Sequence, residues 1–390
     1  MKFLGLLAVV AYMAVSSTVD AAGVFVQPKV GTPIPGKYIV MLKQGTAAID
    51  SFETKFSTIL HRTRVLNASQ GGHRPPKITE RLEELNGFTI EDGDDDLQEL
   101  LGLDEVDYIE QDATFKVIAD VAADARPALL NRNWEKLPNW GHLRITQRNR
   151  VKSECVHRRC ATYKYPKQAG AGITAYVVDT GIQTHNSEFE GRARLGKNFI
   201  KGSPDTDEHG HGTHVASVLG GRLAGVAKKV SLVDVKVIDK TGNATTAGII
   251  AGLNWVRRNA RGKRAIVNMS LGTEHSKALN AAVDALAKAN IPVFVAAGND
   301  PATNSCDYSP AGAPLAFAVA ASNVNDTIAE FSSFGKCVDL IAPGVAAVYM
   351  SMDRNLHTTT QVYNKLKQTA TPSKISGPLR GTPNLLLYLA

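Results

Sequence analysis

The chain has 390 residues, of which 44% are hydrophobic and 21% are charged, and its formal net charge at pH 7 is +7. This length allows two domains, and this composition is that of an ordinary globular protein rather than a disordered one. The basic residues are scattered apart from one cluster, formed by Arg148, Arg150, Lys152, Arg158 and Arg159. Because neither a basic helix nor an aromatic stacking platform accompanies that cluster, we interpret it as a solvated loop and expect no nucleic-acid binding.

The N-terminus has the layout of a secretory signal. Lys2 precedes an apolar stretch from Phe3 to Val15, and small residues follow around Ala21. That stretch is shorter than the about 20 residues that a membrane span needs. We therefore predict a signal peptide over residues 1–21, a secreted, extracellular protein and no membrane anchor. Export also makes three Asn-x-Ser/Thr sites candidates for glycosylation, namely Asn67, Asn243 and Asn325.

Export is compatible with disulfide bonds, and the chain has four cysteines: Cys155, Cys160, Cys306 and Cys337. Four cysteines allow three pairings. We favour Cys155–Cys160, which flank a short basic loop, and Cys306–Cys337, which both lie in loop-like sequence. A zinc site is the weaker alternative, since the sequence contains no C-x-x-C pair.

Residues 22–120 are predicted to form a small α+β domain. Strands are expected over KYIVML, GFTI and VDYIEQDATFKV, the last of which alternates with period two. Helices are expected over Thr46–Leu60 and Leu97–Leu101, and a loop over Gly71–Lys77. Residues 121–139 are interpreted as a linker.

From Gly172 onward, apolar strands alternate with helices. The strands are ITAYVVD, VSLVDVKVI, AIVNMSLG and PVFVAAGN, and the helices are HVASVLGG, TAGIIAGLNWVRRNA and KALNAAVDALAKAN. Near-continuous Val, Ile and Ala strands separated by helices indicate a parallel α/β sheet with helices on both faces. Functional residues in such sheets lie at the carboxyl ends of the strands.

Two polar residues stand directly after predicted strands. Asp179 follows AYVV, and Asn299 follows PVFVAAG. At the end of a strand Asp179 is a candidate functional residue, and the Asn299 amide is suited to donate a hydrogen bond to a developing oxyanion. The alternative for each is structural, because Asp and Asn also favour turns for local hydrogen bonding.

Three histidines gather in the stretch DEHGHGTHVASVLGG, at His209, His211 and His214. The helical zinc pattern H-E-x-x-H is not present in this stretch, which argues against metal ligation. A histidine at a helix N-terminus, flanked by glycines that allow close approach of the backbone and a substrate, is instead suited to be a general base.

Asp, His and Asn in this order along one α/β sheet resemble the subtilisin-type serine peptidases of the proteinase K branch. VVDTGI resembles that family's Asp motif, HGTHVA its His motif, SLG its substrate-binding strand and AAGN its oxyanion motif. WGHLRI resembles the start of a mature fungal enzyme, and GTPNLLLYLA its end. The resemblance implies a subtilisin-like α/β domain over residues 140–390, preceded by an inhibitory propeptide of ferredoxin-like α+β fold over residues 22–120.

The resemblance also implies roles for single residues. Asp179 would orient His211, His211 would act as the general base, and Asn299 would hold the oxyanion. An extended protein or peptide substrate would lie between two walls of the cleft, one formed by Ser270, Leu271 and Gly272 and the other by Gly242 and Asn243. The enzyme would be a monomer whose other partner is its own propeptide.

No cofactor is expected for the chemistry, but the resemblance implies a structural calcium ion. Its ligands would be the carbonyl groups of Pro314 and Ala316 and the Asp339 carboxylate, since calcium prefers such oxygen donors.

The family's nucleophilic serine belongs to a motif, G-T-S-M-A-x-P, that this sequence does not contain. Instead LIAPG runs directly into VAAVYMSM, which resembles the second half of the helix that should carry the serine. We therefore predict an internal deletion of about 25 residues at the 344/345 junction. Other serines are poor substitutes: Ser351 lies inside the helical run, Ser332 and Ser333 lie in a loop, and Ser270 lies in the substrate strand.

The sequence thus predicts a secreted subtilisin-like serine endopeptidase precursor by family, without its nucleophile. Two interpretations stay open. In one, the deletion is an artefact of the gene model or of splicing, and the full-length product, which has the serine segment, hydrolyses proteins. In the other, the chain is an inactive homologue or splice variant that acts as a binding or inhibitory protein.

Overall fold

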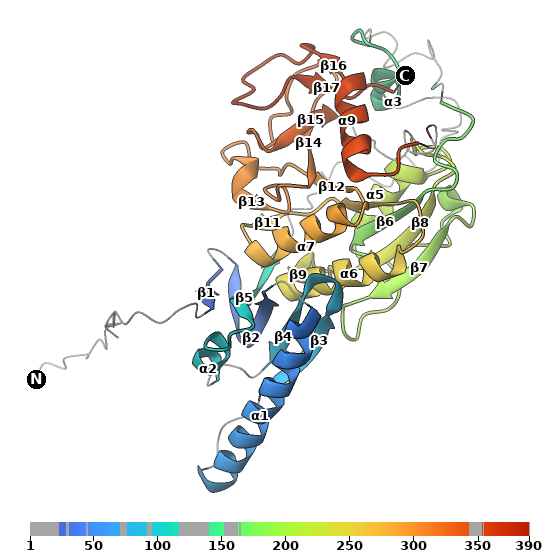
Figure 1. The fold of residues 1–390 in the computed structure, drawn as a ribbon. Helices are drawn as coiled ribbons and strands as arrows, with labels where there is room; N and C mark the ends of the chain where they lie inside the picture. The colour runs from blue at the N-terminus through green and yellow to red at the C-terminus, as the bar shows by residue number, and fades with distance from the viewer. Residues whose placement is uncertain are drawn as a thin grey trace, which may run out of the picture.

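The computed structural model describes residues 23–28, 31–43, 46–70, 76–91, 96–116, 140–151, 163, 165–342, 353 and 355–389. The predicted signal peptide, the linker, the Cys155–Cys160 pair and the 344/345 junction lie outside the described residues. Figure 1 shows two units, of which the N-terminal one lies against helices of the larger one. No helix in the described part of the chain is long and apolar enough to cross a membrane.

The N-terminal unit is a mainly antiparallel sheet with two helices. Its elements are β1 (Val24–Val26), β2 (Thr32–Leu42), α1 (Thr46–Gln70), β3 (Lys77–Leu82), the short 3-10 helix η1 (Glu83–Leu85), β4 (Gly87–Glu91), α2 (Leu97–Leu101) and β5 (Val106–Lys116). Of its described strands, only β1 pairs in parallel, with β5. The order β5-β2-β4-β3, with helices after β2 and β4, is the ferredoxin-like arrangement. The predicted α+β fold of this unit is therefore confirmed.

Two elements of this unit differ from the prediction. Helix α1 runs to Gln70, beyond the predicted end at Leu60. Strand β3 was not predicted, and its first residue, Lys77, had been placed in a loop. Its sequence, KITERL, carries three charged residues because β3 is an edge strand whose side chains are partly exposed.

Both faces of the N-terminal sheet are covered, and β2 shows how. Tyr38, Val40 and Leu42 pack with residues of α1 and α2 in one apolar cluster. Ile39 and Met41 point the other way and join the core of the larger unit. Since alternate residues of a strand face opposite sides, a strand that is buried on both faces reads as a continuous apolar run, here YIVML after Lys37.

The larger unit is built on a nine-stranded sheet in the order β16-β17-β15-β14-β12-β10-β6-β8-β7. Its strands are β6 (Thr174–Asp179), β7 (Ala193–Asn198), β8 (Ser231–Lys236), β10 (Ala265–Met269), β12 (Val293–Ala296), β14 (Phe317–Ala321), β15 (Val338–Ala342), β16 (Thr371–Pro372) and β17 (Leu385–Leu386). All pairings in it are parallel except that of β16 with β17. The predicted parallel α/β sheet is confirmed.

Helices cover both faces of this sheet. They are α3 (Trp140–Ile145), α5 (His211–Gly220), α6 (Thr246–Asn259), α7 (Lys277–Lys288) and α9 (Thr359–Thr369). Alternate residues of β6 again divide between the faces: Tyr176 and Val178 pack with α6 and α7, whereas Ala175 and Val177 pack with α5 and α9. The N-terminal unit lies on the α6 and α7 side (Figure 1).

Smaller elements complete the larger unit. They are the 3-10 helices η4 (Ser187–Phe189) and η5 (Ser305–Asp307), the short strand β9 (Asn243–Thr245), and the two-stranded sheet of β11 (Thr273–Glu274) and β13 (Tyr308–Ser309). Strand β9 pairs with β5 of the N-terminal unit and so joins the two units by backbone hydrogen bonds.

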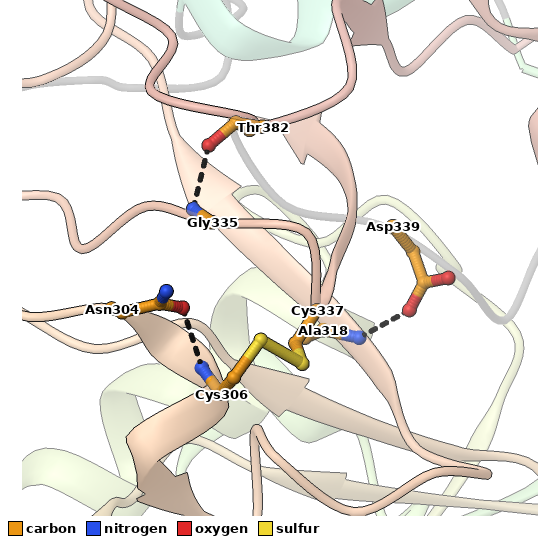
Figure 2. Close-up of a disulfide and its surroundings, with 7 residues drawn as sticks. All are labelled: Asn304, Cys306, Ala318, Gly335, Cys337, Asp339 and Thr382. Atoms are coloured by element: carbon orange, nitrogen blue, oxygen red, sulfur yellow. Dashed lines mark hydrogen bonds between the residues drawn. A yellow bond between two sulfur atoms is a disulfide. The ribbon is translucent and has the colours of Figure 1, made fainter.

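Cys306 and Cys337 form a disulfide, as predicted, with their Cα atoms 5.3 Å apart. Figure 2 shows that the bonded loops are held by side chains as well, since Asn304 accepts a hydrogen bond from the Cys306 N–H and Thr382 accepts one from the Gly335 N–H. The bridge ties the loop after β12 to the start of β15.

Candidate active site

Asp179 and His211 are brought into direct contact. Asp179 is the last residue of β6 and is completely buried, and His211 is the first residue of α5. The Nδ1 atom of His211 lies 2.7 Å from Oδ1 of Asp179. Gly212 makes this approach feasible, because a Cβ atom on it would lie 2.2 Å from the Gly181 carbonyl oxygen. Of the glycines that flank His211, Gly212 is therefore one that no residue with a side chain could replace without a clash.

Asp207 organises the loop that leads into α5. Its carboxylate accepts hydrogen bonds from the backbone N–H groups of His209, Gly210 and Thr213 and from the hydroxyl groups of Thr213 and Thr180. Thr180 in turn accepts the N–H of Gly212 at 2.9 Å. Asp207 and Thr180 were not predicted as site residues, although Asp207 begins the stretch DEHGHGTHVASVLGG and Thr180 lies in VVDTGI.

These carboxylates set the protonation of His211. Burial by itself lowers the pKa of His211, but the hydrogen bond to Asp179 and the charges of Asp179 and Asp207 outweigh burial, so the pKa is raised. Burial alone would raise the pKa of Asp207, but its many hydrogen bonds lower that pKa and keep it ionised. The neutral imidazole therefore donates its Nδ1–H to Asp179 and leaves Nε2 as the basic nitrogen.

Asn299 lies in the turn that follows β12, and its side chain is exposed. Gly298 before it has a φ of 113°, and a Cβ atom there would lie 2.6 Å from the Ser333 hydroxyl oxygen. That hydroxyl donates to the Asp300 carbonyl at 2.8 Å and holds the turn. In the described part of the chain, no hydrogen bond engages the Asn299 amide, so it is available to a ligand.

The two predicted walls of the substrate cleft differ in their surroundings. Ser270, Leu271 and Gly272 follow β10, and the Ser270 hydroxyl accepts a hydrogen bond from the Asn268 amide at 2.9 Å. On the other side, Asn243 lies in β9 and Gly242 immediately precedes it. That wall is covered by the N-terminal unit, because Phe115 and Lys116 of β5 stand opposite Ala244 and Asn243.

A cavity of about 290 Å³ lies beside this site. It is lined mainly by apolar side chains of α5 and of strands β10, β12 and β14, among them Val215, Val218, Leu219, Phe294 and Val319, and it reaches His214 and Ser270. The α5 side chains in this lining are only partly buried. Helix α5 thus turns an apolar face into space that the described residues do not fill.

Of the predicted calcium ligands, the Asp339 side chain is already engaged by two partners. The Asp339 carboxylate accepts the Ala318 N–H at 2.8 Å, as Figure 2 shows, and its other oxygen lies 2.5 Å from the Lys367 ammonium. A cation already sits where the carboxylate would bind calcium. The described residues also contain no cluster of three or more His, Cys, Asp or Glu side chains that would hold a metal ion.

The other predicted residues lie in different environments. Ser332 and Ser333 are buried in the loop before β15, and Ser351 lies outside the described residues. Among the glycosylation candidates, Asn325 is exposed, Asn243 is partly buried under β5, and Asn67 lies in α1. A glycan on Asn325 would meet solvent, whereas one on Asn243 would compete with β5.

The Subtilase family matches residues 170–372, which is more than half of the chain and includes Asp179, His211 and Asn299. The chain belongs to the subtilase family. The resemblance that the motifs indicated is therefore confirmed, and with it a subtilisin-like serine protease ancestry.

Relatives of this subtilase are found among fungi. It is 39% identical to subtilisin-like protease 2 of Pseudogymnoascus destructans, over 79% of this chain and 71% of that protein. It is 34% identical to subtilisin-like protease 3 of Trichophyton equinum, over 97% of this chain and 96% of that protein. Its fold matches the crystal structure of a cold-adapted subtilisin-like serine proteinase with a TM-score of 0.60 and 36% identity, over 65% of this chain and 99% of that one.

Proposed function

We propose that this subtilase is a secreted serine endopeptidase precursor in which the substrate cleft and the Asp–His pair are present and the nucleophile segment has been lost at the 344/345 junction. The full-length product, once its N-terminal unit has been released from the cleft, would hydrolyse peptide bonds of extended protein substrates. The chain as written would, after the same release, bind them without cleaving them. The 2.7 Å contact between His211 and Asp179 at the carboxyl edge of the sheet carries this proposal.

In the full-length enzyme, His211 would take the proton of the serine hydroxyl through Nε2 while the serine oxygen bonds to the substrate carbonyl carbon. The imidazolium, stabilised by Asp179, would then give that proton to the leaving amine as the C–N bond breaks. The exposed Asn299 amide would donate to the oxyanion of the intermediate, where a fixed donor has its largest effect.

The length of one alignment supports the loss of an internal segment. The match to subtilisin-like protease 3 of T. equinum runs over 409 positions, whereas this chain has 390 residues, so at least 19 positions of that relative have no counterpart here. The unfilled apolar face of α5 agrees with this, since the predicted missing elements include part of a buried helix.

The test begins with the genomic DNA between codons 344 and 345. We expect an in-frame stretch that encodes G-T-S-M-A, and its absence would argue against a full-length enzyme. The chain with this segment restored should be labelled by a fluorophosphonate probe and should lose labelling in the His211→Ala variant. The chain as written should not be labelled, and labelling of it would reveal a nucleophile that we have not identified.

The N-terminal unit fits the role of an inhibitory propeptide. Its last strand, β5, covers the wall formed by β9, and two of its carboxylates bind the N-termini of α6 and α7. Purified residues 22–120 should inhibit an active subtilisin-like enzyme at micromolar concentration or below. No inhibition would refute this role while leaving the Asp–His site untouched.

Export, the oligomeric state and calcium binding are expected from membership of the family. We propose export through residues 1–21 and a monomeric protein. A calcium ion bound by Asp339 would have to displace the Lys367 ammonium.

A further inference from the structure

A second basic cluster lies far from the candidate active site. Arg257, Arg258, Arg261, Lys263 and Arg264 fall within eight residues, from the last turn of α6 to the residue before β10. This connection precedes β10, whereas Ser270 follows it, so the cluster lies at the opposite edge of the sheet from the Asp–His pair. This cluster was not predicted, because the basic residues outside 148–159 were interpreted as scattered.

The cluster lines a cavity of about 450 Å³. Four of its cations contribute to the lining, and they are joined by His357 and by one acidic side chain, that of Glu84. Glu84 comes from η1 of the N-terminal unit. A mainly basic cavity is therefore entered by a single carboxylate, which is supplied by another part of the chain.

Glu84 is held in this cavity as an anionic ligand would be. One carboxylate oxygen lies 3.3 Å from Nε of Arg257, and the other accepts a hydrogen bond from Arg261. Its backbone carbonyl also accepts from Arg257, and its N–H donates to the buried Asn254 amide at 3.1 Å. The Glu84 side chain is only 9% exposed. The guanidinium groups of Arg257 and Arg261 thus each bind one carboxylate oxygen of Glu84.

The N-terminal unit also supplies the other charges that face this cluster. Arg258 lies 3.9 Å from Glu80 and 4.0 Å from Glu83. In the described part of the chain, every ion pair of Arg257, Arg258 and Arg261 is made to an acid in residues 80–84. Removal of the N-terminal unit would leave five clustered positive charges without these three negative ones.

We propose that the connection between α6 and β10 forms a binding site for sulfate or phosphate ester groups of a polysaccharide, with Glu84 as its internal occupant until the N-terminal unit leaves. The release of that unit rests on the proposed function. Guanidinium forks match the oxygens of such esters as they match those of Glu84. No Phe, Tyr or Trp is among the described residues that line the cavity, which disfavours single-stranded nucleic acid, whose bases stack on such rings.

The site can be tested in the full chain by emptying it. The variant Glu80→Gln/Glu83→Gln/Glu84→Ala removes three negative charges and vacates the cavity. The matched control, Asp205→Asn/Asp307→Asn/Glu330→Gln, removes the same charge from exposed positions elsewhere. Binding is measured with soluble dextran sulfate, dextran phosphate and uncharged dextran, and circular dichroism checks that each variant folds.

We expect the emptied variant to bind dextran sulfate or dextran phosphate at least about tenfold more tightly than the unmodified chain, with a strong salt dependence. The relative affinity for the two dextrans identifies which ester the site prefers. The control should change less than twofold, uncharged dextran should not bind, and adding Arg257→Ala/Arg261→Ala should abolish the gain. An equal gain in the control, a gain that survives the two Arg substitutions, or tighter binding of DNA than of either dextran would overturn the proposal.

A separate measurement addresses the release of the N-terminal unit. The unmodified chain is nicked within residues 117–139 and passed over a size-exclusion column. If the unit stays bound, the release in the proposed function fails, while the emptied variant still decides whether the anion site exists.

Discussion

The Asp112 carboxylate on β5 accepts a hydrogen bond from the backbone N–H of Ala247, at 2.9 Å, in the first turn of α6. Two residues earlier on the same strand, Glu110 binds the N–H of Ala278 and the hydroxyl of Ser276 at the start of α7. Helix N-termini carry a partial positive charge and free N–H groups, so one strand of the N-terminal unit caps two helices of the peptidase unit. This contact suggests how pH acts on the docking of the two units.

Docking of the N-terminal unit should weaken as pH rises. Burial raises the pKa of Asp112 to about 6, above the value of about 3.9 in an unfolded chain. The folded state therefore binds this proton more tightly, and the resulting stabilisation is complete below about pH 4 and is lost as pH rises through about 6. Its size is about 3 kcal/mol, since one pKa unit corresponds to about 1.4 kcal/mol.

The measurement is the melting temperature of the full chain against pH, in comparison with Asp112→Asn. The variant should show a flatter profile between about pH 4 and pH 7, because it cannot titrate there. Asp107→Asn is the control, since Asp107 is an exposed acid on the same strand. Parallel profiles for the unmodified chain and Asp112→Asn would contradict the assignment.

Asp207→Asn should lower the pKa of His211. The Asp207 charge is one of the influences that raise this pKa, and the carboxylate also fixes the loop in front of α5. The pKa is read from the imidazole signals in an NMR titration of the full chain, which needs no nucleophile. Asp205→Asn removes an exposed charge nearby and should leave the pKa of His211 within about 0.2 units. If Asp207→Asn lowered the pKa of His211 by less than this control does, Asp207 would have no role in setting that pKa.

Replacing both Cys306 and Cys337 by serine should cost about 3–4 kcal/mol of stability, because the bond closes a loop with a sequence separation of 31 residues in the unfolded chain. We expect a lower melting temperature that a reducing agent does not lower further. In the unmodified chain the same reagent should produce a decrease of similar size. A double variant as stable as the oxidised chain would show that the bond adds no stability.

Lys367→Ala should create a response to calcium. The Lys367 ammonium lies against Asp339, and its removal leaves a carboxylate oxygen for an ion. Millimolar calcium should then raise the melting temperature of the variant more than that of the unmodified chain, and Asp339→Asn should abolish the rise. Equal responses in all three proteins would place any calcium effect elsewhere.

Local patterns predicted much of the fold. The runs ITAYVVD and KYIVML were identified as strands because residues buried on both faces leave a continuous apolar signal. Strand β3 was missed because an edge strand keeps charged side chains and lacks that signal. Asp179 and His211 were also identified from local sequence. Asp179 stands at the end of an apolar strand, and His211 stands between two glycines.

What the sequence by itself determined is the family, the layout of the two units and the absence of the serine motif, because each is written in contiguous stretches such as VVDTGI, HGTHVA and LIAPGVAAVYMSM. Only the tertiary structure decided which charges meet. Asp112 and Ala247 are 135 residues apart, and Glu84 and Arg257 are 173 apart. Local propensity carries no information on such pairs, since their geometry arises when the N-terminal sheet packs on α6 and α7 and buries the groups together.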